Sequence, residues 1–196
     1  MKRVFDIVSS GIGLILLSPI FLLLAILIKL DSRGPVFYKQ LRVGKYGKDF
    51  KIFKFRSMLQ GADKKGLITI GGRDPRVTRS GYYIRKYKLD EIPQLINVFI
   101  GDMSVVGPRP EVRKYVNLYT EEQLKVLSVK PGITDIASIK YRNENELLEK
   151  SDSPDQMYIE VIMPDKLRYN LEYINKQSFI YDLKLIFLTF KEIITR

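Results

Sequence analysis

Residues 7–28 read IVSSGIGLILLSPIFLLLAILI and contain no charged side chain. A membrane-embedded α-helix needs about 17–25 predominantly apolar residues, and this run falls within that range. A secretory signal peptide would have a shorter apolar core of roughly 7–15 residues, followed by a small-residue cleavage site. Here Lys29 follows directly. The run therefore predicts a membrane segment that is retained.

Ser18-Pro19 lies at the middle of this run. Proline has no N–H to donate to the carbonyl of Ile15 and its ring clashes with that turn, so a break in the helix is expected. The Ser18 hydroxyl is expected to donate back to the carbonyl of Leu14. Each half measures roughly 16 Å, about half of a hydrocarbon core ~30 Å thick. We therefore predict that residues 1–32 form a re-entrant helix-break-helix, which enters the membrane and leaves it on the same side.

Positive charges flank both ends of the run, with Lys2 and Arg3 before it and Lys29 and Arg33 after it. Basic flanks are retained on the cytoplasmic side of a membrane, so both ends are compatible with a cytoplasmic location. A kinked helix that spans the membrane once is the alternative, because proline is common in membrane helices. In either case, residues 33–196 are expected to form a domain held at the bilayer.

The composition restricts the chemistry of this domain. The 196-residue chain contains no cysteine and no histidine, which excludes a thiol nucleophile, a disulfide framework and the usual general base. No Walker loop and no G-x-G-x-x-G pattern occurs. The net charge is +11, and the basic excess falls within residues 29–90. Such a block indicates contact with anionic lipid, nucleic acid or a phosphate-bearing substrate, unless it is only a solvated basic face.

A β-hairpin is predicted between residues 36 and 56. Residues 36–42 and 50–56 have strand-forming composition, and the turn residues of 44–47 separate them. Side chains alternate along a strand, so Lys54 and Arg56 share one face. Two cations on one face suit a phosphate contact, although an exposed strand face is the commoner meaning of this pattern.

Residues 89–99 predict a helix that begins at Asp90. Asp90 suits an N-cap and Glu91 suits the first turn, so capping alone would explain Asp90. The alternative is functional, because the helix dipole and free N–H groups would keep this carboxylate ionised at a place where phosphates bind. The apolar stripe of this helix consists of Leu89, Ile92, Leu95, Ile96 and Phe99.

Arg109 lies between Pro108 and Pro110. The fixed φ angles of both prolines restrict the backbone and present the guanidinium group in a defined direction. Such a group suits bidentate contact with a phosphate, and the alternative is a rigid turn with a solvent-exposed arginine.

Apolar residues recur at helical spacing near the C-terminus, with charged residues elsewhere around the helix. The pattern predicts an amphipathic helix, which either packs on the domain core or lies in the bilayer interface. The apolar positions are Phe179, Ile180, Leu183, Ile186, Phe187, Phe190, Ile193 and Ile194.

A series of short motifs extends over almost the whole chain. They are residues 2–6 (KRVFD), 18–19 (SP), 34–37 (GPVF), 54–58 (KFRSM), 89–95 (LDEIPQL), 101–104 (GDMS), 107–110 (GPRP) and 130–134 (KPGIT). With these motifs in this order, the chain resembles the small monotopic phosphoglycosyl transferases of bacteria. These are membrane sugar transferases that start glycan assembly on a polyprenyl phosphate.

The resemblance implies an α+β fold, in which the re-entrant helix precedes a small, mainly helical catalytic domain with a short β-hairpin and interfacial amphipathic helices. It implies a monotopic protein on the cytoplasmic face of the bacterial inner membrane. The implied partners are a UDP-sugar donor, undecaprenyl or another polyprenyl phosphate as acceptor, and membrane lipid, without nucleic acid. A homodimer is left open.

The resemblance also implies roles for individual residues. Asp90 would attack the β-phosphorus of the donor, forming a phosphosugar-enzyme as UMP leaves, and polyprenyl phosphate would then take the phosphosugar. Glu91 would hold Mg²⁺, and we expect Glu91→Gln to impair activity without unfolding the domain. A carboxylate nucleophile agrees with a chain that lacks cysteine and histidine. The substrate-binding residues would be Lys54, Arg56, Arg85, Pro108, Arg109 and Pro110.

Residues 135–142 (DIASIKYR) depart from the common family pattern, in which a glycine stands at the position of Asp135. This segment is expected to border the sugar, so the departure leaves the sugar's identity open. The alternative function is a membrane-tethered nucleic-acid-binding or adaptor protein. That alternative has no recognisable nucleic-acid motif and does not explain the Asp-Glu pair or the Pro-Arg-Pro turn.

Overall fold

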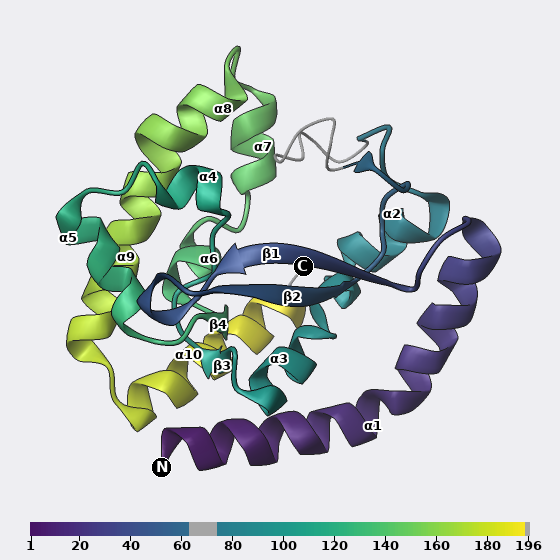
Figure 1. Ribbon diagram of the computed structural model, residues 1–196, viewed down its shortest axis with the longest axis horizontal. Helices are drawn as coiled ribbons and strands as arrows, with labels where there is room; N and C mark the ends of the chain where they lie inside the picture. The colour runs from purple at the N-terminus through teal and green to yellow at the C-terminus, as the bar shows by residue number, and fades with distance from the viewer. Residues whose placement is uncertain (63–73, 195–196) are drawn as a thin grey trace.

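The computed structural model describes residues 1–62 and 74–194, and it is mainly helical with two small two-stranded sheets (Figure 1). The predicted combination of an apolar N-terminal helix, a short hairpin and a mainly helical remainder is confirmed. The strands are β1 Phe37–Val43, β2 Asp49–Phe55, β3 Ser104–Val106 and β4 Gly132–Thr134. The helices are α1 Lys2–Asp31, α2 Arg79–Lys86, α3 Gln94–Ile100, α4 Arg113–Val116, α5 Glu121–Leu124, α6 Ile136–Lys140, α7 Glu144–Glu149, α8 Pro154–Met157, α9 Met163–Lys176 and α10 Phe179–Ile194.

Helix α1 continues through Pro19 and changes direction along its length, so that its two halves border the rest of the molecule on two sides (Figure 1). The Ser18 hydroxyl donates to the carbonyl of Ile15 at 2.8 Å, rather than to that of Leu14. Ile15 is the residue whose carbonyl loses its donor at Pro19, so the serine replaces the missing backbone bond. The helix therefore bends instead of being interrupted. By length and apolar composition, α1 could cross a membrane.

Charged side chains fasten the first turns of α1 to the domain. Lys2 Nζ donates to the carbonyl of Val106 at 2.9 Å and to the Asp182 carboxylate of α10 at 2.6 Å. Asp6 is buried, and its Oδ1 accepts from the Ser104 hydroxyl and from the Val105 amide, both at 3.0 Å. These basic and acidic residues thus hold the start of α1 against β3 and α10.

The second half of α1 packs on the hairpin. Leu24 and Ile28 are buried together with Phe55 of β2 and Ile84 of α2. The other side of the helix exposes a continuous set of large apolar side chains among the described residues: Ile12, Ile15, Leu16, Ile20, Leu22, Leu23, Ile26, Leu27 and Leu30. Exposed apolar surface of this extent is typical of contact with lipid or a partner.

The predicted hairpin is confirmed as the antiparallel pair β1 and β2, with Phe37 opposite Phe55 and Val43 opposite Asp49. The far edge of β2 is bound by α3: Asn97 Oδ1 accepts from the Phe53 amide at 2.9 Å, and Asn97 Nδ2 donates to the Lys51 carbonyl at 2.8 Å. A side-chain amide thus satisfies the backbone of an otherwise open strand edge.

Helix α3 buries two polar residues and one apolar residue against the domain, and part of its apolar stripe lies against α1. Its buried positions are Gln94, Asn97 and Val98, whereas Leu95 and Phe99 pack against Gly13 and Gly11 of α1. The predicted apolar stripe thus packs partly on α1. A Cβ on Gly11 would make ordinary contact with Phe99 at 3.4 Å, and a Cβ on Gly13 would lie 3.2 Å from the Leu95 side chain.

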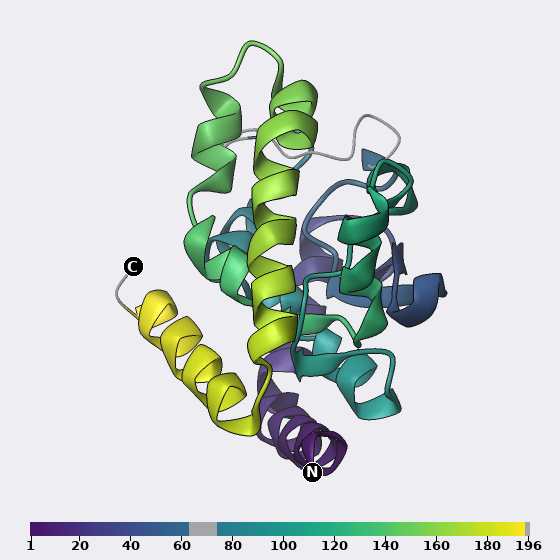
Figure 2. The ribbon, with the colours of Figure 1, turned by 90° about the vertical axis from the view of Figure 1, so that its left-hand side faces the viewer.

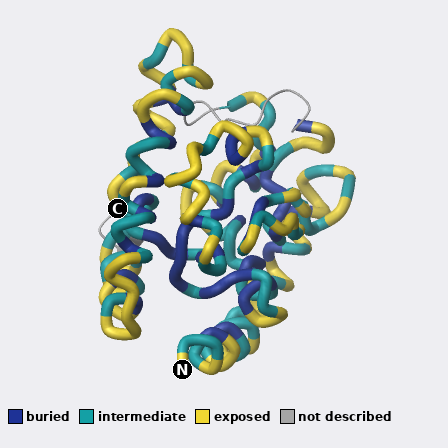
Figure 3. The backbone as a smooth tube through the Cα atoms, turned by 60° about the vertical axis from the view of Figure 1, so that its left-hand side comes forward, coloured by how far each residue is buried: buried dark blue, intermediate teal, exposed yellow. Residues whose placement is uncertain are grey.

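The C-terminal part is a helical layer around a core that includes Val112, Leu148, Ile162 and Leu167. Figure 2 shows α9 and α10 following one another at an angle, and Figure 3 shows that buried segments lie centrally. Asp182 and Leu185 are the buried residues of α10. Its exposed side carries the apolar residues Phe179, Ile180, Leu183, Phe187 and Phe190.

Candidate active site

Asp90 lies in a 3₁₀ turn, Leu89–Glu91, which precedes α3. The residue before this turn, Lys88, adopts a left-handed backbone conformation with φ 54°. Helix α3 begins later, at Gln94, with Pro93 before it and without a side-chain cap. The N-cap interpretation of Asp90 is therefore wrong, because the chain makes a tight turn at the place where a regular helix was expected.

The Asp90 side chain is 9% exposed and makes no hydrogen bond to any described residue. Burial of most of a carboxylate without a donor is costly, although the Asp90 oxygens are not among the fully enclosed polar atoms that lack a partner. Burial, together with the neighbouring charge of Glu91, raises the pKa of Asp90, and the charges of Lys54, Arg85 and Arg109 oppose this rise. No regular helix begins at Asp90, so the ionised form of this carboxylate is stabilised by these three cations and not by a helix dipole.

Glu91 is held by two cations from different parts of the chain. Lys54 Nζ of β2 donates to Glu91 Oε1 at 2.9 Å. Arg109 donates to both carboxylate oxygens, with Nη1 3.0 Å from Oε2 and Nη2 in close contact with Oε1. Burial would raise the pKa of Glu91, but the charges and hydrogen bonds of Arg109 and Lys54 outweigh it and hold that pKa well below its ordinary value.

The pKa values of Lys54 and Arg109 shift in opposite directions. Burial lowers the pKa of Lys54 despite the attraction of Glu91. The charge of Glu91 raises the pKa of Arg109, which burial alone would lower. A carboxylate pair and two cations therefore form one electrostatic unit at the end of β2 and beside the Pro-Arg-Pro turn.

The Pro-Arg-Pro turn lies against β4 because two glycines allow the backbones to approach. A Cβ on Gly132 would lie 2.1 Å from the Gly107 nitrogen, and a Cβ on Gly107 would lie 2.5 Å from the Lys130 carbonyl oxygen. The Gly132 amide donates to the Pro108 carbonyl at 2.9 Å. The rigid turn predicted from the sequence is thus present, and its arginine is paired with Glu91 while 32% of its side chain remains exposed.

The structure places Arg56 apart from this unit. Its guanidinium group is buried and donates to the carbonyls of Ser32 and Arg33 at 2.7 Å and of Ile28 at 3.2 Å, at the C-terminal end of α1. Arg56 thus satisfies carbonyl groups that a helix end leaves without partners. Arg85 of α2, in contrast, lies near enough to Asp90 for its charge to lower that residue's pKa.

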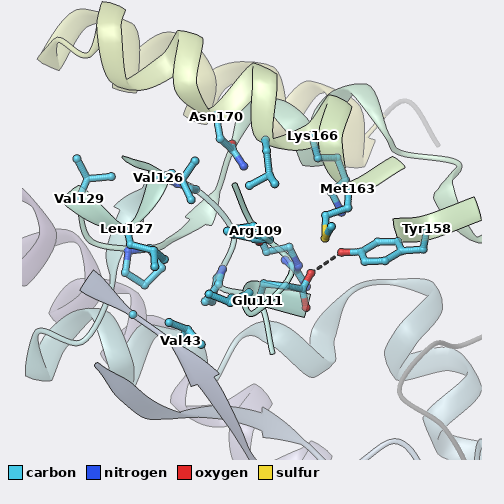
Figure 4. Close-up of a pocket in the computed structure, with 17 residues that line it drawn as sticks. Val43, Arg109, Glu111, Val126, Leu127, Val129, Tyr158, Met163, Lys166 and Asn170 are labelled. Atoms are coloured by element: carbon cyan, nitrogen blue, oxygen red, sulfur yellow. Dashed lines mark hydrogen bonds between the residues drawn. The ribbon is translucent and has the colours of Figure 1, made fainter. Parts of the chain in front are cut away.

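A cavity of about 40 Å³ lies behind Arg109 and is lined by Pro108, Arg109 and Pro110 together with residues of α9 (Figure 4). This volume suits a few water molecules and is far too small for a nucleotide. Asn170 of α9 lines the cavity, and its buried Oδ1 has no partner among the described residues. The cavity therefore supports ordered water behind the arginine rather than the substrate itself.

Sequence reasoning did not assign a role to Asp135 or to Gln94. Asp135 is buried, caps α6 by accepting from the Ser138 amide at 2.8 Å, and adds to the negative charge acting on Arg109. Gln94 is fully buried, and neither of its amide atoms has a partner among the described residues. The signal for Asp135 was its departure from the family pattern, and the signal for Gln94 was a polar residue one turn after the Asp-Glu pair.

The donor atoms at the pair fit Mg²⁺. Among residues 1–62 and 74–194, no group of three or more acidic, histidine or cysteine side chains is placed to hold a metal. Mg²⁺ commonly uses one or two carboxylates together with substrate phosphate oxygens. Glu91 Oε2 accepts one hydrogen bond and Asp90 accepts none, so both carboxylates keep free oxygen lone pairs.

Known proteins of similar sequence show the family to which the chain belongs. The family model described as bacterial sugar transferase matches residues 1–196. The chain is 40% identical over 193 residues to the UDP-glucose:undecaprenyl-phosphate glucose-1-phosphate transferase of Escherichia coli K12. This match covers 96% of this chain and 39% of that protein. It is 38% identical over 203 residues to the exopolysaccharide production protein PSS of Rhizobium leguminosarum, covering 100% of this chain and 96% of that protein.

A third relative is the UDP-N-acetylgalactosamine-undecaprenyl-phosphate N-acetylgalactosaminephosphotransferase of Aeromonas hydrophila, 38% identical over 198 residues. The match covers 100% of this chain and 44% of that protein. The chain thus spans less than half the length of this relative and of the Escherichia coli one, although it spans nearly all of the Rhizobium protein. The match to the family model over every residue shows that the chain belongs to the bacterial sugar transferase family.

Proposed function

We propose that the protein transfers a phosphosugar from a UDP-sugar to a polyprenyl phosphate, giving a polyprenyl diphosphate sugar and UMP. The observation that carries this proposal is the buried Asp90 carboxylate, which has no hydrogen bond to the described part of the chain and lies beside Glu91 and its cations Lys54 and Arg109. An unpartnered carboxylate among cations can act on a phosphorus atom whose oxygens those cations bind. The names of the relatives in Escherichia coli and Aeromonas support an undecaprenyl phosphate acceptor and a UDP-sugar donor.

The reaction proceeds in two displacements. In the first, an oxygen of Asp90 forms a bond to the β-phosphorus of the donor, the bond from that phosphorus to the bridging oxygen breaks, and UMP leaves with the bridging oxygen. In the second, a phosphate oxygen of polyprenyl phosphate attacks the same phosphorus and Asp90 is released as a carboxylate. No general base is needed to activate the nucleophile, which agrees with a chain that lacks histidine.

The cations stabilise the charge that spreads over the phosphoryl oxygens during each displacement. Lys54, Arg85 and Arg109 carry this role, and Glu91 fixes the direction of Lys54 and Arg109 through its three hydrogen bonds. Mg²⁺, held by Glu91 and the diphosphate, would supply further charge neutralisation when bound.

The outer face of α10 and the exposed face of α1 support a position at the membrane. Both carry large apolar side chains that face solvent in the described part of the chain, including Phe187 at 70% and Ile180 at 80% exposure. We propose that α1 is re-entrant and that α10 lies in the interface on the cytoplasmic face of the bacterial inner membrane. This arrangement would hold Asp90 near the phosphate of a membrane-dissolved acceptor.

The proposed reaction is tested by UMP release. Detergent-solubilised protein with Mg²⁺ and undecaprenyl phosphate should release UMP from at least one sugar in a panel of UDP-sugars, and the Asp90→Asn variant should release none. Absence of release from every member of a broad panel would favour the non-catalytic membrane adaptor instead.

The re-entrant topology predicts that both ends of α1 lie on one side of the membrane. Because the chain has no cysteine, Val4→Cys places a single thiol on the exposed side of the first turn, and avoids Lys2, which is fastened to Asp182. An impermeant thiol reagent added to spheroplasts should fail to label it and should label it after lysis. The control is Leu118→Cys in the domain, which should behave in the same way.

Labelling of the Val4 thiol from outside, with the Leu118 thiol still protected, would contradict the re-entrant model and establish a single span. Pro19→Ala should move part of the population toward that spanning state, because it restores the backbone hydrogen bond to Ile15 and removes the cause of the bend.

A further inference from the structure

The Pro-Arg-Pro turn is fastened on both sides of Arg109. On one side, the Pro108 carbonyl accepts from the Gly132 amide at 2.9 Å. On the other side, the Pro110 carbonyl accepts from Arg42 Nη1 at 3.1 Å. Proline has no backbone N–H, so the carbonyl is its only backbone hydrogen-bonding group, and these two bonds fix where the turn lies.

Arg42, at the end of β1, also binds the next residue of the turn. Its Nη1 donates to Glu111 Oε1 at 3.0 Å, while the Val43 amide donates to the Glu111 carbonyl at 2.9 Å. The Arg42 and Glu111 side chains are both 18% exposed, so the pair is largely shielded from solvent. The hairpin is thus connected to the turn through a guanidinium group that makes two bonds to it at once.

The remaining contacts hold Arg42 and Glu111 in place. Gln40 Oε1 accepts from Arg42 Nη2 at 2.8 Å and from Arg42 Nε at 3.1 Å. Glu111 also accepts from its neighbour's amide, Val112 N, at 2.7 Å and from the Tyr158 hydroxyl (Figure 4). A side chain with this many fixed contacts has little freedom to move, and it transmits that rigidity to the Pro110 carbonyl.

We infer that Arg42 is a positioning residue that sets the direction of Arg109 toward Glu91 by holding the Pro110 carbonyl and Glu111 together. Arg42 touches neither Glu91 nor Asp90 in any described contact, so its hydrogen bonds reach the unit through the turn. Beside the effect of burial, its charge also contributes to lowering the pKa of Lys54, an effect that Arg42→Lys would keep. This inference rests on the proposed function, in which Arg109 and Glu91 are part of the catalytic unit. A displacement of about 1 Å in such a unit can cost roughly 10²-fold in rate.

The test compares Arg42→Gln with a matched control, Arg113→Gln. Arg113 also binds the hairpin, with Nη2 2.7 Å from the Gly47 carbonyl and 2.5 Å from Asp49 Oδ1, but it lies on the exposed surface. Arg42→Gln should lower kcat by about 10–100-fold with less than a threefold change in the KM for the donor, because alignment is lost rather than donor binding. Arg113→Gln should remain within about twofold of the wild-type kcat.

The double variant identifies the route of the effect. If Arg42 acts through Arg109, Arg42→Gln should change kcat less than about twofold once Arg109→Gln is present. Independent, multiplied effects of the two substitutions would show a general structural role and overturn the inference. Arg42→Lys keeps the counter-charge for Glu111 but cannot reproduce the planar fork, so its kcat should stay at least about fivefold below wild type. Full activity of Arg42→Lys would also overturn the inference.

A readout that needs no turnover separates this inference from the proposed function. Glu91 and Arg109 form an ion pair, so the fall in melting temperature of the Glu91→Gln, Arg109→Gln double variant should differ from the sum of the falls in the two single variants. That difference should disappear when the same cycle is measured with Arg42→Gln present. If wild type and Arg113→Gln both lack turnover, the proposed function fails, and this thermal cycle alone decides the role of Arg42. Unchanged non-additivity in the Arg42→Gln background would overturn it.

Discussion

Replacement of Asp90 by Asn is expected to reduce sugar-phosphate transfer by roughly three orders of magnitude or more, the scale seen when an enzyme loses its nucleophile. An amide cannot form an acyl phosphate, so the first displacement is lost and not merely slowed. The unpartnered position of Asp90 gives no structural contact that the amide would break.

The same variant should be at least as stable as the wild type. Because burial raises the pKa of Asp90, the folded chain holds this proton more tightly than the unfolded chain does, so keeping Asp90 as the ionised nucleophile costs stability once the pH exceeds the folded-state pKa. Asn removes the charge and therefore cannot cost stability through it. The control is Asp155→Asn on α8, the same chemical change in an exposed ion pair with Lys114, which should keep full activity.

Thermal unfolding in detergent and a UMP-release assay measure the two effects separately. A variant that retains substantial turnover would exclude Asp90 as nucleophile and leave direct transfer in a single displacement. A variant that is inactive because it unfolds would restore a structural role for Asp90, which the absence of any hydrogen bond argues against.

Glu91→Gln is expected to lower kcat by about 10²-fold and also to destabilise the fold. The sequence led us to expect an effect on activity alone. The structure shows Glu91 as the shared acid partner of Lys54 and Arg109, so the amide leaves two largely buried cations without a counter-charge. Loss of one partner of a buried ion pair costs about 3–5 kcal/mol, and the 20% exposure of the Glu91 side chain favours the lower end of that range.

A second substitution distinguishes the two contributions of Glu91. Lys54→Met in the Glu91→Gln background removes one of the unpaired cations and should recover part of the lost stability, without restoring activity. Denaturant unfolding gives the free energies, and the Mg²⁺ dependence of the residual rate reports the metal. Normal activity and normal Mg²⁺ dependence in Glu91→Gln would remove Glu91 from the site.

The elements that the sequence predicted correctly depend on local signals. The long apolar helix follows from an uncharged apolar run, its change of direction from Pro19, although the helix continues where a break was predicted, and the hairpin from two strand-forming segments around glycines. The Pro-Arg-Pro turn is rigid because both prolines fix their own φ angles. Each of these features is determined within a few residues, so single-sequence reasoning can reach it.

The features that sequence reasoning missed depend on contacts between distant segments. By periodicity, Arg56 would share a strand face with Lys54. In the fold its guanidinium group instead donates to the carbonyls of Ser32 and Arg33, which follow α1 and lie beside the end of β2. Lys2 was interpreted only as a membrane flank, although it binds Asp182 at the other end of the chain. A charge pattern shows that a partner is needed, and only the fold shows which partner is near.

The same limit applies to the helix at residues 94–100. The sequence showed its apolar stripe but not what the stripe packs against: Leu95 and Phe99 lie against α1, and Asn97 binds the edge of β2. Local propensity also placed a helix start at Asp90, where the chain instead makes a 3₁₀ turn after the left-handed Lys88. Both differences follow from neighbours that have no signature in the local sequence.

The most direct measurement is the mass of the wild-type protein after incubation with Mg²⁺ and a UDP-sugar donor, in the absence of acceptor. The account predicts an added mass equal to one phosphosugar, on the peptide that contains Asp90, in a linkage that hydroxylamine cleaves and that undecaprenyl phosphate discharges. Wild-type protein that turns over the same donor with acceptor present, yet never acquires this adduct under rapid quenching, would contradict the covalent mechanism.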